Sequence, residues 1–137
     1  MTAKEYLNQA YIIDRRISID DAKLNAMRAA LHGRGVNYES DGSQHIPQGN
    51  SIEAAIIKVI EYEERVNAEI DELVDKKREI EKVINRIENV QLREIIIRRY
   101  LQFQKWEKIA VDMNTDLRWI YRLHKKALGE VDKIIDH

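Results

Sequence analysis

Four basic residues near the end of the chain recur at the spacing of one helix face. At 100° per residue, Arg118, Arg122, Lys125 and Lys126 fall on the same side of a helix. A guanidinium group matches a guanine edge or a phosphate as a bidentate donor, so Arg118 and Arg122 are candidate base or phosphate contacts. Lys125 and Lys126 are point charges and are candidate phosphate contacts with little sequence information. The spacing therefore predicts a surface that binds a polyanion.

This candidate DNA-binding surface also includes Thr115, Trp119 and Tyr121. Thr115 and the first backbone N–H groups of the following helix are expected near a phosphate backbone, because a helix amino terminus favours anions. Asp116 is interpreted as the N-cap of that helix. Trp119 and Tyr121 flank the basic stripe. We expect them to support the core of the domain, with contact to a sugar or a thymine methyl group as the alternative.

Two short helices are predicted to position these residues. The first spans 106–113, with Trp106, Ile109, Ala110 and Met113 on one face. A three-residue polar turn, 114–116, leads to a second helix. Its apolar face holds Leu117, Ile120, Leu123, His124, Ala127 and Leu128, opposite the basic stripe. This arrangement predicts a helix-turn-helix, in which the small Ala110 lies at the helix crossing and Ile120 fills the angle.

The charge distribution agrees with a polyanionic partner for this region. The chain has 23 Lys and Arg against 24 Asp and Glu, so its charges nearly cancel. Residues 91–128 nevertheless hold nine basic and four acidic residues, a net +5, whereas residues 51–90 hold seven and eleven, a net −4. Such a local excess decides which partners a region attracts. The competing interpretation is an ordinary solvated helix face.

Upstream of this segment, the sequence predicts a long helical hairpin. A first helix, 2–31, begins with a capping box at Thr2 and Glu5. Its seam is Tyr6, Ala10, Ile13, Ile17, Asp20, Leu24, Met27 and Leu31. Residues 32–50 carry four of the five glycines and the only proline, and predict a flexible loop. A second helix, with Ser51 as N-cap, is expected to reach about Glu88. Its heptad seam is Ile52, Ile56, Val59, Glu63, Val66, Ile70, Leu73, Lys77, Ile80, Ile84 and Ile87.

These elements predict an all-α protein with two domains. The first, 1–90, is a long antiparallel coiled-coil hairpin for oligomerisation, and the second, 91–137, is the helix-turn-helix domain. Asn89 and Val90 mark the break, a lead-in helix covers 91–103, and the tail, 129–137, extends the last helix. The second helix is longer than the first, so part of its seam must meet the carboxy-terminal helices, a second copy, or both. We expect both, and hence a homodimer.

The sequence contains little that would support catalysis. It has no cysteine, no glycine-rich phosphate loop and no nucleophile motif, and its four histidines share no metal-ligand spacing. Adjacent acidic residues such as Asp20 and Asp21 point about 100° apart on a helix and are interpreted as solvated. We expect no catalysis, no metal and no cofactor. No apolar run approaches the ~20 residues that cross a bilayer, and the amino terminus lacks a signal peptide, so we expect a cytoplasmic protein without membrane contact.

The segment from Trp106 to Ile120 resembles a known family. Its pattern Trp106-x-x-Ile109-Ala110-x-x-Met113-x-x-Asp116-x-x-x-Ile120 is similar to region 4 of bacterial sigma-70-type factors, and LREIIIRRYL is similar to that region's lead-in helix. Asp116 stands at the family's usual Ser or Thr, and Trp119 at its usual Thr. Together with the two hairpin helices, the chain resembles small sigma-like transcriptional regulators of the ArpU/RinA type from phages and prophages of Gram-positive bacteria.

This resemblance implies a DNA-binding phage or prophage transcriptional regulator. No segment resembles the part of a sigma factor that binds core polymerase, so a full sigma factor is not expected. Double-stranded DNA is the expected partner, with host RNA polymerase as a further candidate. Two alternatives stay open: a protein-interaction module that docks on RNA polymerase or another partner, and a DNA-recognition subunit of the phage packaging machinery. The target sequence and the sign of regulation are not encoded in any motif.

Overall fold

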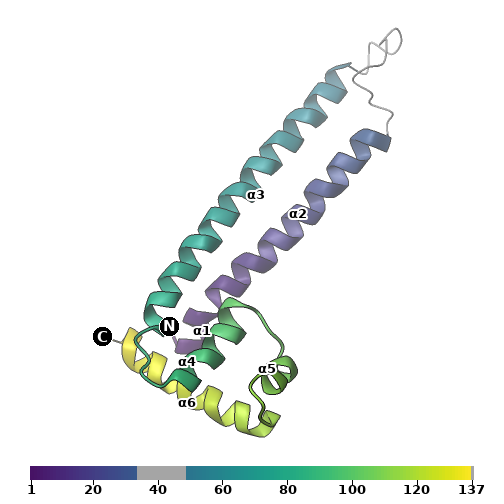
Figure 1. Ribbon diagram of the computed structural model, residues 1–137. Helices are drawn as coiled ribbons and strands as arrows, with labels where there is room; N and C mark the ends of the chain where they lie inside the picture. The colour runs from purple at the N-terminus through teal and green to yellow at the C-terminus, as the bar shows by residue number, and fades with distance from the viewer. Residues whose placement is uncertain (34–48, 137) are drawn as a thin grey trace. The chain divides into compact units, whose positions relative to one another are not determined.

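The computed structural model describes residues 1–33 and 49–136. These ranges form the helices α1 (Ala3–Leu7), α2 (Gln9–Gly33), α3 (Gly49–Ile84), α4 (Val90–Ile96), a π-helical turn η2 (Ile97–Leu101), α5 (Trp106–Asp112) and α6 (Leu117–Ile135) (Figure 1). The described residues contain no strand, which confirms the all-α class. None of their helices is both long and apolar enough to cross a membrane. The predicted loop lies, from 34 to 48, outside the described residues.

Residues 15–71 form one compact unit from parts of α2 and α3. Its ion pairs join Arg16 Nε to Glu69 Oε2 at 2.9 Å, Arg65 Nε to Asp20 Oδ2 at 3.4 Å, and Arg28 Nη2 to Glu63 Oε1 at 3.3 Å. Residue numbers rise on one helix as they fall on the other, so the helices are antiparallel, as predicted (Figure 1). The core of this unit is Leu24, Leu31, Val59 and Val66.

One position of the predicted seam is wrong. Ile70 is 42% exposed, whereas its neighbour Glu69 is only 8% exposed. Glu69 lies against Asp20, itself 7% exposed, so the two helices meet here through buried carboxyl groups and not through an isoleucine. Burial, followed by the hydrogen bond and the charge of Asp20, raises the pKa of Glu69 above its usual value.

The helix ends differ from the predicted ends by a few residues. Asn8 separates α1 from α2, although the capping box of Thr2 and Glu5 is confirmed by hydrogen bonds of 3.2 and 3.0 Å. The third helix begins at Gly49, so Ser51 lies inside it and is not its N-cap. It ends at Ile84, and the Asn89 side chain caps α4 by accepting from two backbone N–H groups.

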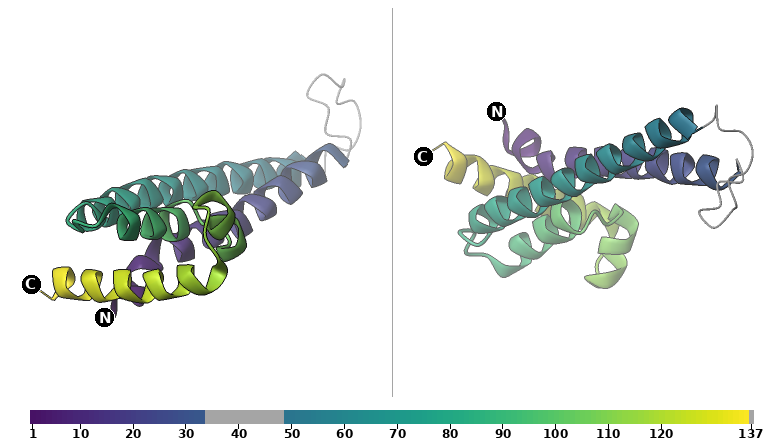
Figure 2. Two further views of the ribbon diagram at one scale, coloured as in Figure 1. Left: turned by 60° about the horizontal axis from the view of Figure 1, so that its bottom comes forward. Right: turned by 90° about the horizontal axis from the view of Figure 1, so that it is seen from above.

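Residues 1–14 and 72–137 form the second compact unit. In it α1, α4 and α5 all pack on α6, and Figure 2 shows α4 and α6 from two sides. The Ala3 backbone N–H donates to Asp132 Oδ1 at 2.8 Å, which ties the start of the chain to its last helix. The fully buried large side chains of this unit are Leu7, Ile80, Ile84, Ile87, Ile95, Ile96, Ile109, Ile120 and Val131. The end of the α3 seam therefore meets the carboxy-terminal helices, as predicted.

Lys77, a polar exception in the predicted seam, has a structural explanation in this unit. Its Nζ lies 4.7 Å from the centre of the Phe103 ring, an arrangement in which a cation is attracted to the aromatic face. Phe103 has a φ of 55°, a left-handed conformation that costs energy for a bulky residue. Its ring also packs edge-on against Tyr11, with centroids 5.7 Å apart. The Phe103 ring therefore contacts side chains of both α2 and α3.

The two compact units do not coincide with the predicted domains, 1–90 and 91–137. The amino-terminal segment 1–14 groups with the last helices, and the end of α3 does so too. The division at residue 90 concerns which segments fold independently, and it stays a prediction.

Candidate nucleic-acid interface

A tight turn joins α5 to α6. The Asn114 N–H donates to Val111 O at 3.1 Å, and the Thr115 N–H donates to Ala110 O at 3.0 Å. Asn114 has a φ of 54°, a left-handed conformation that asparagine adopts more readily than most residues. This is the Schellman pattern of a helix end, and it satisfies the carbonyl groups of Ala110 and Val111 in the last turn of α5.

Asp116 starts the second helix, as the sequence predicts. Its Oδ1 accepts the Trp119 backbone N–H at 2.7 Å, which makes it the N-cap of α6. Thr115, a predicted backbone contact, is half-buried in the turn. The Asp116 carboxylate therefore occupies one of the backbone donors at the amino terminus of α6 that a phosphate could otherwise use.

The predicted inner faces of the two helices form the core of this region. Ile109 and Ala110 of α5 are buried, as are Ile120, Leu123 and Ala127 of α6. Leu117, His124 and Leu128 are half-buried. Ala110 and Ile120 thus lie in the interior, where the helix-turn-helix prediction places them.

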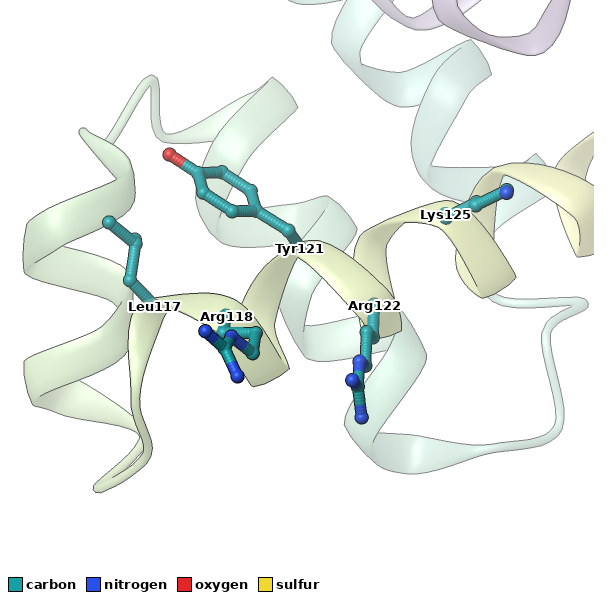
Figure 3. Close-up of a pocket in the computed structure, with 5 residues that line it drawn as sticks. All are labelled: Leu117, Arg118, Tyr121, Arg122 and Lys125. Atoms are coloured by element: carbon teal, nitrogen blue, oxygen red, sulfur yellow. The ribbon is translucent and has the colours of Figure 1, made fainter.

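The outer face of α6 carries the four predicted cations. Arg118, Arg122, Lys125 and Lys126 are all exposed. Within the described ranges, none of the four lies within 4.0 Å of a carboxylate oxygen. Figure 3 shows Arg118 and Arg122 projecting from one side of α6, one helical turn apart. Their charge is therefore not neutralised by the described part of the chain.

Other cations of the basic window are already engaged. Arg98 contacts Glu94 at 2.8 Å and Asp112 at 3.1 Å, and Lys108 contacts Asp112 at 3.1 Å. Arg99 donates to Gln104 O at 2.9 Å. Three of the five other cations in residues 91–128 are therefore engaged within the protein, whereas Arg93 and Lys105 have no carboxylate oxygen of the described residues within 4.0 Å.

The two flanking aromatic residues are more exposed than the sequence suggested. Trp119 is 44% exposed and Tyr121 is 45% exposed, so neither is a core residue. The Tyr121 ring packs edge-to-face on Trp106 of α5, with centroids 5.5 Å apart. Trp119 makes no ring contact with the described residues. Tyr121 is therefore the more firmly held of the two.

A polar contact that the sequence did not predict lies between η2 and α6. Tyr100 Oη and His124 Nε2 are 2.7 Å apart, and the His124 ring packs edge-to-face on Trp106 at 4.5 Å. The Arg99 guanidinium lies 4.6 Å from the centre of the Trp106 ring. The sequence could have indicated part of this cluster, because Trp106 and His124 both fall on the predicted inner faces of their helices.

Burial sets the protonation of this cluster. It lowers the pKa of His124 to about 4, with smaller contributions from the positive charges of Lys4 and Arg99. Burial also raises the pKa of Tyr100 to about 12. His124 is therefore neutral at physiological pH, and its contact with Tyr100 is a hydrogen bond between uncharged groups.

Two further observations bear on what the site can do chemically. In the described part of the chain, no three His, Cys, Asp or Glu side chains gather in a way that could hold a metal ion. A hollow of about 460 Å³ lies along α6, lined by Leu117, Arg118, Tyr121, Arg122 and Lys125. In the view of Figure 3, Leu117 and Tyr121 extend above α6 and Arg118 and Arg122 extend below it. The arrangement suits binding to an anionic partner.

The comparisons with known proteins give a family and no function. The comparison with curated proteins found no match, and neither did the comparison with solved structures. A family model described as "Protein of unknown function (DUF1492)" matches residues 48–132, which include the whole of α3, α4, η2 and α5 and most of α6. Because this match covers more than half of the chain, the protein belongs to the DUF1492 family.

Proposed function

We propose that this protein is a sequence-specific DNA-binding transcriptional regulator that places α6 in the major groove of double-stranded DNA. The observation that carries the proposal is the outer face of α6, with four exposed cations that no described carboxylate neutralises. A helix that follows a short helix and a tight turn is the element with which helix-turn-helix proteins contact bases.

Each cation has a role that follows from its chemistry. Arg118 and Arg122 are in the first turns of α6 and contact guanine edges, because a guanidinium donates two parallel hydrogen bonds. Lys125 and Lys126 lie further along and bind phosphates. Thr115 lies near the DNA backbone, while Trp119 and Tyr121 flank the basic stripe.

The biological setting rests on the resemblance of the segment from Trp106 to Ile120 to sigma region 4. It supports a phage or prophage regulator of transcription, with host RNA polymerase as a further partner. Two copies bind together through the hairpin, 1–90, and their α6 helices contact neighbouring half-sites. Four exposed isoleucines of unit 15–71 support the pairing: Ile19, Ile57, Ile60 and Ile70.

A salt titration tests the proposal. If about five phosphates are neutralised, the logarithm of the binding constant should fall with the logarithm of salt concentration with a slope of about −4 to −5. The Arg118→Ala/Arg122→Ala variant should lose specific binding while its helical circular dichroism is unchanged. Arg28→Ala removes an exposed cation from the other compact unit and should leave binding unaltered. Normal specific binding by the double variant would show that α6 is not the recognition helix.

A second substitution separates base contacts from phosphate contacts. Lys125→Ala should weaken binding to all sequences by about the same factor and reduce the salt slope by about 1. Competition between the selected site and random DNA measures this directly. A loss confined to the selected site would assign Lys125 to base recognition instead.

A protein-interaction module is the second candidate, favoured by the same exposed isoleucines. A flat salt response, or no binding to DNA of the native genome, would support it. Mapping the bound sites across the host genome separates the remaining alternatives. Sites in promoters support a transcriptional regulator, and a site in a packaging sequence supports a subunit of the packaging machinery.

A further inference from the structure

The hollow along α6 is lined both by apolar side chains and by cations. Leu117 and Tyr121 contribute its apolar surface, and Arg118, Arg122 and Lys125 line the rest (Figure 3). Leu117 is half-buried at the first position of α6, and Tyr121 lies one turn further on. The hollow holds about 460 Å³, enough for the edge of a base rather than for a single atom.

The Tyr121 ring is held in place by Trp106 of α5. It packs edge-to-face on Trp106 at 5.5 Å. Trp106 is in turn fixed by the His124 ring at 4.5 Å and by the Arg99 guanidinium at 4.6 Å. A ring fixed in this way loses little conformational freedom when a ligand contacts its free surface, so it binds at low entropic cost.

The charges around the hollow define the class of its ligand. Three cations at its margin favour a polyanion, and an apolar patch beside them favours a polyanion with an apolar group on the face it presents. In the major groove, the C5 methyl group of thymine is the apolar group that the base edges present, and cytosine has only hydrogen at that position.

We propose that Tyr121 and Leu117 recognise the methyl group of a thymine in the DNA site, beside the guanines that Arg118 and Arg122 contact. This inference rests on the proposed function and adds a determinant of specificity to it. Tyr121 is assigned this role because it lines the hollow and is fixed by Trp106, whereas the equally exposed Trp119 does neither.

The test uses the full-length protein and a duplex that it selects from a random-sequence pool. Each thymine of that duplex is replaced in turn by deoxyuridine, which removes the methyl group and keeps the base pair. One replacement should weaken binding by about fourfold, as expected for the loss of one buried methyl group. This measurement needs no protein variant, so it cannot fail through misfolding.

A Tyr121→Ala variant then links the methyl group to the residue. It should bind the thymine and deoxyuridine duplexes equally, so that the fourfold difference disappears. Tyr121→Phe keeps the ring and should keep the difference. Trp119→Ala is the matched control: it removes an aromatic ring of similar exposure on the same helix, and the difference should persist.

Each remaining outcome counts against the inference. If no thymine replacement weakens binding, or if the difference persists in Tyr121→Ala, the hollow does not recognise a methyl group, while the DNA-binding function stands. If the protein selects no sequence at all and its binding does not depend on salt, the proposed function fails, and this inference fails with it.

Discussion

Within residues 91–136, some arginine and lysine side chains are paired with carboxylates and others are not, and the neighbouring residues decide which. Arg98 is engaged by Glu94 and Asp112, whereas Arg118 has no carboxylate of the described chain within reach. A charge already paired inside the protein gains little from a phosphate, because the existing pair must be broken first. The proposed interface is therefore smaller than the basic window that the sequence shows.

His124 makes a prediction about pH at the residue scale. Its pKa is about 4 in the folded protein, below the 6.5 of an unperturbed histidine, so between these values the unfolded chain binds more protons. The free energy of unfolding should therefore fall as the pH is lowered from 6.5 to 4. The contribution is well below the limit of about 1.4 kcal/mol per pH unit for one proton, because the ring is partly exposed.

The variant His124→Gln isolates this effect. It can still hydrogen-bond to Tyr100 but does not titrate, so its unfolding free energy should vary less over this pH range than that of the original protein. Urea denaturation at several pH values measures the difference. Identical pH profiles for the two proteins would mean that His124 has the same pKa in the folded and unfolded states.

At the scale of elements, the contact between α2 and α3 depends on a pair of carboxyl groups. Asp20 and Glu69 are buried together, with Arg16 and Arg65 at their edges. Polar groups in a helix seam often define its register at some cost in stability. This pair replaces the isoleucine contact that a regular heptad would make.

Substitution of Glu69 by glutamine should reveal the cost of the pair. The raised pKa of Glu69 means that its ionised form is disfavoured in the folded state. Ionisation of Glu69 therefore lowers the free energy of unfolding most at pH values above the raised pKa, and this loss vanishes as the pH falls below about 4.5. Glu69→Gln can donate to Asp20 and should raise the unfolding free energy at pH 8 by about 1 kcal/mol. The gain should shrink toward pH 4.5.

Urea denaturation at both pH values checks this, with Glu63→Gln as the control. Glu63 pairs with Arg28 at 3.3 Å and is 43% exposed on its side chain, so its substitution should bring no gain. If Glu69→Gln destabilises the protein at pH 8, the ion pair with Arg16 outweighs the repulsion from Asp20.

At the scale of the whole molecule, the proposed dimer requires that a second copy cover exposed isoleucines of this chain. Ile57 and Ile60 of α3 are 55% and 49% exposed in the single chain, and a second copy would cover them. Ile57→Asp/Ile60→Asp should weaken self-association by at least tenfold, because a buried isoleucine contributes about 1.5–3 kcal/mol. Analytical ultracentrifugation measures the dissociation constant of each protein.

Val111→Asp is the control for that measurement. Val111 is 75% exposed on α5, in the other compact unit, and its substitution should leave self-association unchanged. Sedimentation of the original protein as a monomer at high concentration would rule out the dimer. The protein would then bind DNA as a monomer.

Local features could be read from the sequence, and features that join distant segments could not. The capping box of Thr2, the N-cap Asp116 and the two faces of α6 depend on residues within a few positions of one another, so composition and spacing determine them. The hydrogen bond from Ala3 to Asp132 and the contact of Tyr100 with His124 join residues 129 and 24 positions apart. Only packing decides such pairs.

The same distinction separates the parts of the candidate site. Which cations lie on the outer face of α6 follows from a 3.6-residue period, and the sequence alone determines it. The tertiary structure decided three further features. They are which cations are left unpaired, the contact of Asp20 with Glu69 and not with Ile70, and the contact by which Trp106 fixes Tyr121. Helical periodicity specifies a direction around one axis, whereas a contact also requires the position of a second element, and no local pattern contains that position.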